Sequence, residues 1–420
     1  MSWGWEHHPS RKIIGEASTE LRGRKIALGV TSSAAIYKSV DLARELMRAG
    51  AEVTVVMSSE ATRLISPALF EWATGRPVYR GRFSGEVGHI LLAETHDAIL
   101  VAPATASTMA KLAHGIADTA VTLAAHSFLG EGKPVLLAPA MHLSLYKSME
   151  RLGVVSKLRE AGFVVHEPRV EGNRAKFPDP RALAWHAEAL VVRGKDLDGL
   201  RVLVTAGPTR EYIDRVRFIS NPSSGKMGVA LAVEASYRGA SVSLVHGPLS
   251  GIEHDVGRAF RVETTREMAR RTLEELEVFK PNVVILAAAP TDFAPAAVFD
   301  GKLDSSSPIN LQLVPTPKIS REVAERREPG TILVLFAAEI AESEEELAEK
   351  AIEKKTWYGA DVIVANNVGT PGVGFASDFN EVLVLYGEKP EVLKIERSPK
   401  RIVARRVLDV VKSLIEAKRG

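Results

Sequence analysis

The chain contains two stretches with the same order of strand, helix and strand. In the first, large apolar side chains occupy every second position up to residue 30 in the stretch 24–30, residues 34–48 have helical spacing, and residues 50–56 form a second strand-like stretch. Residues 202–204, 229–237 and 239–245 repeat this order. Strands that alternate with helices are typical of parallel sheets. The pattern predicts two doubly wound, mostly parallel, three-layer α/β domains.

The length of the chain and its further apolar runs indicate how many domains it contains and where they begin and end. A chain of 420 residues is long enough for two or three domains. We expect domains over residues 24–193 and 200–420, joined by a polar linker at 194–199. Residues 1–23 have no apolar signal core, and we interpret them as an arm that packs on a neighbouring subunit.

Composition excludes several classes of function. The net charge of +2 gives no reason to expect a nucleic-acid or membrane partner, and no apolar run reaches the ~18 residues of a membrane helix. The absence of cysteine excludes disulfides, cysteine-ligated metals and thiol catalysis, and it fits a cytoplasmic location.

The polar loop at residues 205–228 follows a strand and precedes a helix. Its Ser-Ser-Gly-Lys ending offers backbone N–H groups, hydroxyls and an ammonium to a phosphate. A P-loop is excluded, because Ser220 stands where a glycine is needed and Met227 where Ser or Thr is needed. No GxGxxG fingerprint occurs, which disfavours an NAD dehydrogenase. A tight glycine turn with an incidental lysine is the simpler alternative.

This loop resembles the signature of the phosphopantothenate–cysteine ligases, and the similarity runs over about residues 200–413. The resemblance implies a Rossmann-like second half. There CTP, with Mg²⁺, activates the carboxylate of phosphopantothenate as an acyl-cytidylate, and the amine of cysteine then attacks. It assigns Asn221 to the tetrahedral intermediate and Lys302 to the charge of the triphosphate.

The resemblance also gives nucleotide contacts. They are Ser223, Ser224, Gly225, Lys226, Asp292, Lys302, Pro317, Lys318, Ile319, Phe336, Lys354, Tyr358 and Asn366. Two departures weaken the expected preference for CTP: the lysines after Lys302 are absent, and Tyr358 replaces a family lysine.

In the first half, small and hydroxyl side chains follow several strands. A loop with a single glycine suits one phosphate better than a pyrophosphate. The pattern over residues 24–190 resembles the FMN-dependent cysteine decarboxylases, specifically phosphopantothenoylcysteine decarboxylase, which implies a flavoprotein-like fold with bound FMN. The implied FMN contacts are Gly29, Thr31, Ser32, Ser33, Ser58, Ala104, Thr105, Ser107 and Ala140.

The resemblance makes His89 the catalytic base of the decarboxylase. His142 replaces the asparagine that binds the substrate carboxylate, and Lys176 or a neighbour stands in the loop whose cysteine protonates the product. Neutral or protonated histidine can donate the required hydrogen bond. A lysine can donate a proton, although its pKa would need lowering.

Three functions therefore stay open. The first is a bifunctional enzyme that makes phosphopantothenoylcysteine and decarboxylates it for coenzyme A biosynthesis. The second is a working ligase fused to a flavin-binding module without decarboxylase turnover, and the third is a regulatory flavoprotein. The resemblance also implies a homo-oligomer with trimer contacts between flavin domains and dimer contacts between ligase domains.

Overall fold

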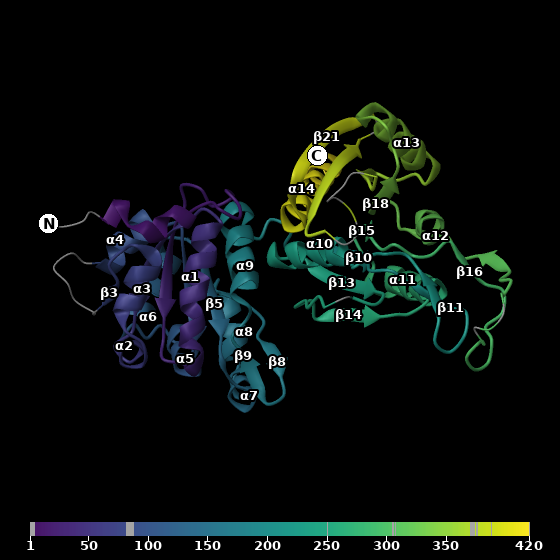
Figure 1. Ribbon diagram of the computed structural model, residues 1–420. Helices are drawn as coiled ribbons and strands as arrows, with labels where there is room; N and C mark the ends of the chain where they lie inside the picture. Colours follow the sequence, from purple (N-terminus) through teal and green to yellow (C-terminus); the bar gives the residue numbers. More distant parts are fainter. Residues whose placement is uncertain are drawn as a thin grey trace. The chain divides into compact units, whose positions relative to one another are not determined.

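The structure, a computed structural model, describes residues 5–80, 88–249, 251–304, 306, 308–369, 374, 377–387 and 389–419. The chain divides into two compact units, residues 1–194 and 195–420 (Figure 1). Each unit is an α/β domain built on a mainly parallel sheet, so the predicted fold class is confirmed. None of the described helices combines the length and the apolar character needed to cross a membrane.

The first unit contains a six-stranded parallel sheet in the order β3-β2-β1-β4-β5-β7. Its strands are β1 (Lys25–Val30), β2 (Glu52–Met57), β3 (Tyr79–Arg80), β4 (Ala98–Ala104), β5 (Val135–Pro139) and β7 (Val164–Val165). A small antiparallel sheet contains β6 (Met141–His142), β9 (Arg174–Lys176) and β8 (Arg169–Glu171).

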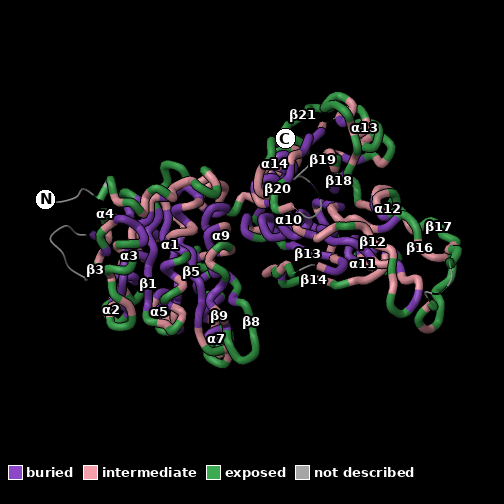
Figure 2. Tube along the Cα trace, in the orientation of Figure 1, coloured by how far each residue is buried: buried purple, intermediate pink, exposed green. Residues whose placement is uncertain are grey.

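Helices cover both faces of this sheet, because the buried strands carry apolar side chains on both sides. One face packs against α1 (Lys38–Arg48), α3 (Pro67–Thr74) and α9 (Pro180–Arg193). The other packs against α4 (Gly88–Thr95), α5 (Ala106–Ala113), α6 (Ala120–Gly130), α7 (Leu143–Arg151) and α8 (Val154–Glu160). The short elements are η1 (Trp5–His7), η2 (Pro9–Ile13), η3 (Ala34–Tyr37) and α2 (Ala61–Leu64). In Figure 2 the strands form the buried centre.

The segment before β1 belongs to the first unit. Arg11 pairs with Glu52 at 3.0 Å, and Leu21 is fully buried in the core beside α1. A side chain at Gly50 would approach the backbone nitrogen of Arg22 to 2.8 Å, so the two segments touch. The expectation of an appended arm was therefore wrong for residues 5–23, because their apolar side chains fill their own domain.

The second unit contains an eight-stranded sheet in the order β14-β13-β10-β15-β18-β19-β20-β21. The strands are β10 (Arg201–Ala206), β13 (Ser241–His246), β14 (Arg258–Arg261), β15 (Val283–Leu286), β18 (Ile332–Glu339), β19 (Val362–Asn367), β20 (Phe379–Tyr386) and β21 (Glu391–Pro399). The pairs from β14 to β19 are parallel, and β20 and β21 continue the sheet antiparallel. Two hairpin-like pairs project from strand ends: β11 (Arg210–Tyr212) with β12 (Phe218–Ser220), and β16 (Phe293–Pro295) with β17 (Leu313–Pro315).

One face of the second sheet packs against α11 (Thr265–Phe279), α12 (Ile319–Arg326) and α13 (Glu344–Trp357). The remaining helices, α10 (Lys226–Tyr237) and α14 (Lys400–Arg419), pack on each other and on strands of the same sheet. Residues of the predicted linker also fold here: Leu197 is buried, and its N–H donates to the carbonyl of Arg238.

Buried charges join α10 to α14. The Arg405 guanidinium donates from Nε to Glu234 Oε1 at 2.7 Å and from Nη2 to Oε2 at 3.1 Å, and both side chains are fully buried. Arg238, also fully buried, makes a similar paired contact to Asp196 at 2.8 and 2.7 Å and reaches Asp409 at 3.0 Å. Such paired contacts fix the geometry of both partners. They hold the last turn of α10 against the first half of α14.

Candidate active sites

The second unit has a cavity of about 240 Å³ at the carboxyl ends of β10, β15 and β18. We call it the Tyr358 cavity; it is lined by Thr205, Leu286, Ala288, Pro290, Thr291, Asp292, Pro317, Lys318, Ile319, Ser320, Leu335, Phe336, Ala337, Lys354, Tyr358 and Ile363. Parallel strands place their carboxyl ends on one edge, where α/β proteins bind ligands. The walls are mostly apolar, which suits a flat ring.

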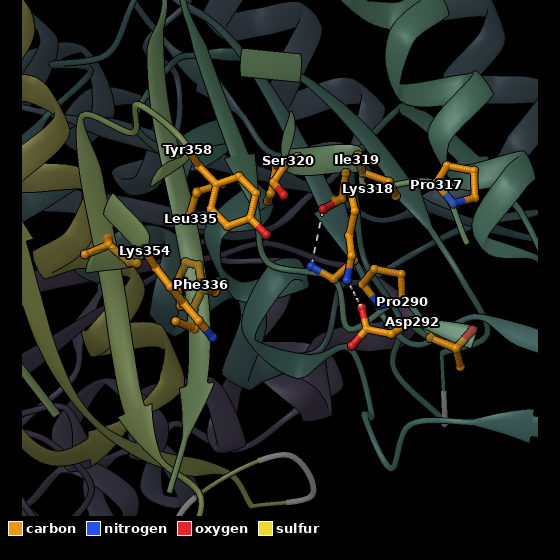
Figure 3. A pocket seen from close by; sticks show the side chains of 16 residues that line it. Pro290, Asp292, Pro317, Lys318, Ile319, Ser320, Leu335, Phe336, Lys354 and Tyr358 are labelled. Atoms are coloured by element: carbon orange, nitrogen blue, oxygen red, sulfur yellow. Dashed lines mark hydrogen bonds and ion pairs between the residues drawn. The ribbon is translucent and has the colours of Figure 1, made fainter. Parts of the chain in front are cut away.

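Charged side chains stand at one side of the Tyr358 cavity. Lys318 Nζ donates to Asp292 Oδ1 at 2.6 Å, and both side chains are more than half exposed. Figure 3 shows this pair opposite Phe336 and Tyr358. A ligand could therefore contact aromatic rings on one side and the ion pair on the other.

A cluster of buried hydroxyl groups positions the Asp292 segment. Thr209 Oγ1 lies 2.7 Å from Thr265 Oγ1 and accepts from the N–H of Thr291 at 3.0 Å. Glu211 accepts from the N–H of Thr265 at 2.7 Å, so the cluster is tied to the start of α11. Because these groups are buried and hydrogen-bonded, the segment before Asp292 is rigidly held.

A second cavity, of about 330 Å³, adjoins the first. We call it the Lys400 cavity; it is lined by Asn221, Ser223, Gly225, Lys226, Met227, Ala287, Ala288, Ala289, Pro290, Asp292, Phe336, Ala337, Ala338, Lys354, Asn366, Gly374, Asn380 and Lys400. Asp292, Phe336 and Lys354 line both cavities, so the two form a continuous site. The lining of the second cavity contains three lysines and three asparagines.

The turn at Gly225 opens α10 beside the Lys400 cavity. Gly225 has a φ of 84°, and a Cβ there would lie 3.2 Å from Gly207 Cα and 2.3 Å from Leu249 Cδ2. Only glycine adopts this backbone at low cost. The turn therefore brings the first N–H groups of α10, with their partial positive charge, to the cavity wall.

Asn221 directly follows β12 and is held by two hydrogen bonds. Its Nδ2 donates to the carbonyls of Ala289 and Pro290 at 3.2 and 2.9 Å. The amide therefore bridges the Ser-Ser-Gly-Lys loop and the segment that leads to Asp292. The Asn221 side chain could therefore contact a reacting group that lies where the two cavities meet.

Each of the three lysines has a described partner. Lys226 pairs with Asp378 at 2.5 Å, and Lys354 pairs with Glu339. Lys400 is 6% exposed, and its Nζ donates to the carbonyl of Gly374 at 3.0 Å. Burial, with a smaller contribution from Lys226, lowers the pKa of Lys400 to about 8, and Asp378 opposes the shift.

Most predicted ligase residues line one of the two cavities. Asp292, Pro317, Lys318, Ile319, Phe336, Lys354 and Tyr358 line the first; Asn221, Ser223, Gly225, Lys226 and Asn366 line the second. Ser224 lines neither, and its Oγ accepts from the N–H of Lys226 at 3.5 Å.

Lys302 also lies outside both cavities. It is exposed, in a loop that Asp214 holds by accepting from the N–H of Leu303 at 3.1 Å.

Sequence reasoning missed Lys400 and Asn380. Both come from the end of the chain, after the last predicted strand, and neither lies in a motif that the resemblance supplied. Lys400 directly follows β21, and Asn380 is the second residue of β20. The antiparallel edge of the sheet brings them to the Ser-Ser-Gly-Lys loop.

In the first unit, the predicted flavin residues gather where the strand order reverses. β1 and β4 are neighbours, and their chain connections run to opposite sides of the sheet. Ligands of open α/β sheets bind at such a switch point. Thr31 follows β1 and donates to the carbonyl of Pro103 in β4 at 2.6 Å. Thr105 caps α5 by accepting from the N–H of Thr108 at 3.3 Å.

The other predicted flavin residues differ in exposure. Ser32 and Ser107 are exposed at helix starts, whereas Gly29, Ser58, Ala104 and Ala140 are buried. A Cβ at Gly29 would lie 2.9 Å from Val121 Cγ1, so this glycine allows α6 to pack closely on β1. Small buried residues and exposed hydroxyls at one sheet edge fit a flat ring with one phosphate.

A cavity of about 660 Å³ lies beside this edge. We call it the His142 cavity; it is lined by Ser33, Ala34, Ala35, Tyr37, Lys38, Ala140, Met141, His142, Arg174, Ala175, Lys176 and Phe177. The pairing of β6 with β9 sets His142 opposite Arg174. His142 Nδ1 lies 3.1 Å from Ser144 Oγ, and Lys176 Nζ pairs with Glu171 at 2.5 Å. Arg174 is a further cation that sequence reasoning left out.

His89 does not line the His142 cavity. It lies in the first turn of α4, and its Nδ1 is buried with no hydrogen-bond partner among the residues that the structure describes. A buried ring nitrogen of this kind is a costly arrangement that a bound ligand or a further residue would relieve.

Each half of the chain matches a known protein family. The family model of the DNA/pantothenate metabolism flavoprotein C-terminal domain matches residues 197–415, and the Flavoprotein family model matches residues 14–188. The coenzyme A biosynthesis bifunctional protein CoaBC of Thermococcus kodakarensis is 41% identical over 412 residues, which cover 97% of this chain and 100% of the relative. The chain belongs to the CoaBC family.

Another CoaBC protein, from Methanocaldococcus jannaschii, is 34% identical over 412 residues, which cover 98% of both chains. A crystal structure of the C-terminal domain of a CoaBC protein has 32% identity and a TM-score of 0.45, and it covers 53% of this chain and 99% of that chain. The predicted family is thus confirmed. The protein is a bifunctional enzyme of coenzyme A biosynthesis, with a flavoprotein half and a ligase half.

Proposed function

We propose that the second unit joins phosphopantothenate to cysteine with CTP, and that the first unit decarboxylates the product with FMN. The observation that carries the ligase proposal is the pair of adjoining cavities that share Asp292, Phe336 and Lys354. An apolar end and a lysine-rich end match a nucleotide base and phosphate groups. We propose that the reaction takes place in the cytoplasm, where nucleoside triphosphates are held.

In the ligase half, the substrate carboxylate attacks the α-phosphorus of CTP and pyrophosphate leaves. The amine of cysteine then attacks the acyl carbon, an amide bond forms, and CMP leaves. We propose that Phe336 and Tyr358 contact the base, and that Lys354, which lines both cavities, stabilises the phosphate charge of CTP. Asn221 would contact the tetrahedral intermediate. Mg²⁺ would enter with the triphosphate, whose oxygens it prefers as ligands.

In the first unit, FMN when bound would supply the reversible oxidation that makes the loss of CO₂ easy. Thr31, Thr105 and their neighbours would hold it at the switch point between β1 and β4. His142 would bind the substrate carboxylate, with Arg174 close by. Lys176 would deliver the final proton, which requires its ion pair with Glu171 to open. His89 would serve as the base, and we propose that subunit contacts bring it to the site.

The test uses the purified full chain with phosphopantothenate, cysteine, CTP and Mg²⁺, and follows pyrophosphate and products by mass. Phosphopantetheine, lighter than the ligated product by one CO₂, is the expected end product. Accumulation of phosphopantothenoylcysteine would reduce the first unit to a flavin-binding module. No pyrophosphate with any nucleoside triphosphate would contradict the ligase proposal.

Adjacent lysines on α13 give a matched control for the nucleotide site. Lys354 lines both cavities, whereas the Lys355 ammonium donates to the carbonyl of Gly387 at 2.9 Å and lines neither. Lys354→Ala should raise the KM for CTP, and Lys355→Ala should leave it unchanged. Equal effects would contradict the assignment of Lys354 to the nucleotide.

A further inference from the structure

Lys400 is the most deeply buried cation at the ligase site. Only 6% of this residue is exposed, yet it lines the Lys400 cavity at the first position of α14. Its backbone N–H donates to the carbonyl of Asp378 and its Nζ donates to the carbonyl of Gly374, each at 3.0 Å. The backbone contact and the helix start fix where the ammonium lies.

An ammonium in this position is costly. Removing a charge from water is unfavourable unless it is paired. Lys226, on α10, lies close enough to lower the pKa of Lys400 further. Asp378 is the carboxylate that acts on Lys400, and it is also bound to Lys226 at 2.5 Å. Lys226 and Lys400 thus lie near the same carboxylate, and an anion bound in the cavity would favour the protonated form of both lysines.

The neighbours of Lys400 are suited to a phosphate group. The start of α10 contributes Ser223, Gly225 and Lys226, and β20 contributes the buried amide of Asn380. Hydroxyl, amide, backbone N–H and ammonium groups together are the donors that a phosphate dianion needs. Asp292 is the carboxylate of the cavity lining, and it lies at the end shared with the Tyr358 cavity.

We propose that Lys400 binds the phosphate of phosphopantothenate in the ligase reaction. Lys400 lines the polar cavity and not the Tyr358 cavity, which holds the aromatic rings proposed for the nucleotide base. The two phosphate-bearing substrates would therefore enter from opposite ends and meet near Asn221. The proposal rests on the ligase function proposed above and names the residue that distinguishes phosphopantothenate from pantothenate.

The test compares Lys400→Met with the wild type, because methionine keeps the unbranched apolar stem of lysine and removes the charge. A lost hydrogen bond to a charged group predicts a rise of about 10- to 100-fold in the KM for phosphopantothenate. The KM for CTP should change by less than about twofold, and weak turnover of pantothenate should be unaffected, since it has no phosphate. Lys412→Met, on the same helix and paired with Asp196 at 3.4 Å, is the control.

The outcomes separate the possible errors. Unchanged KM values for both phosphorylated substrates in a folded Lys400→Met protein would overturn the proposal. A rise confined to CTP would assign Lys400 to the triphosphate instead and would also overturn it. If the wild type releases no pyrophosphate, the proposed ligase function itself is wrong. The role of Lys400 can still be tested in that case, by comparing the calorimetric affinity of wild type and Lys400→Met for phosphopantothenate in the absence of CTP.

A second measurement needs no variant, in case Lys400→Met does not fold. Calorimetric affinity of the wild type for phosphopantothenate should fall as the pH rises through about 8, where Lys400 loses its proton. The substrate phosphate keeps its charge over this range, so its titration does not interfere. Affinity for pantothenate should not follow the same curve. A preference for the phosphorylated substrate that is constant from about pH 7 to pH 9.5 would contradict the proposal.

Discussion

Glu234→Gln tests how the second unit holds its two site-bearing helices together. Glu234 on α10 and Arg405 on α14 are both fully buried and make two hydrogen bonds, at 2.7 and 3.1 Å. Glutamine keeps the size of the side chain but removes the charge and one acceptor. The Arg405 guanidinium then stays buried without its carboxylate.

Removing one partner of a buried ion pair costs about 3–5 kcal/mol, because the remaining charge is uncompensated. We expect the unfolding free energy of the second unit to fall by that amount, which corresponds to roughly 10 °C in Tm for a domain of this size. The double variant Glu234→Leu with Arg405→Met should lose less than either single variant, since no charge is left in the core. Ligase activity should fall as well, because both helices begin at the Lys400 cavity.

Hydrogen exchange followed by mass spectrometry is the suitable assay, since it reports on α10 and α14 separately from the first unit. Glu325→Gln breaks the exposed pair with Arg321, at 2.9 Å on α12, and should give no measurable change. A loss below about 1 kcal/mol in Glu234→Gln, with the Arg405 peptides unchanged in exchange, would refute the reasoning.

Three further changes test single features of the sites. Gly225→Ala places a Cβ against Gly207 at a residue whose φ is 84°, so kcat/KM of the ligase should fall at least about tenfold. Gly257→Ala is the control, because no atom lies within 4 Å of the added Cβ, and equal activity of the two variants would contradict the role of the turn. Asp214→Asn weakens the hydrogen bonds that Asp214 accepts from the N–H groups of Val216, Arg217 and Leu303 at 2.7, 2.6 and 3.1 Å. The loop that contains Lys302 should then become more mobile, and the KM for CTP in steady-state kinetics should rise several-fold. An unchanged KM would show that Lys302 does not depend on Asp214. Lys176→Ala should slow formation of phosphopantetheine without changing pyrophosphate release, because the proposed proton transfer follows the loss of CO₂. Lys157→Ala, whose Nζ lies 3.3 Å from His114 Nδ1, should change neither, and normal phosphopantetheine formation in Lys176→Ala would assign the proton to another donor.

Local sequence pattern predicted the framework of both units. The strand predicted at residues 202–204 lies within β10, and the helix predicted at residues 229–237 begins three residues earlier, at Lys226. Buried parallel strands are apolar and are separated by polar loops, so the sequence alone predicts their positions. The grouping of Asp292, Phe336 and Lys354 came instead from the family resemblance, and the three residues line one cavity.

Tertiary structure decided what local pattern does not encode. Residues 5–23 pack into the first unit because Leu21 and its neighbours fill a gap beside α1, which depends on the shape of that core. Lys400 and Asn380 reach the Ser-Ser-Gly-Lys loop through the antiparallel strands β20 and β21, which carry no site motif. The order in which strands join a sheet is set by long-range packing. The sequence alone therefore determined the folds and the strand-end loops, whereas the closure of the ligase site by the last helix required the assembled sheet.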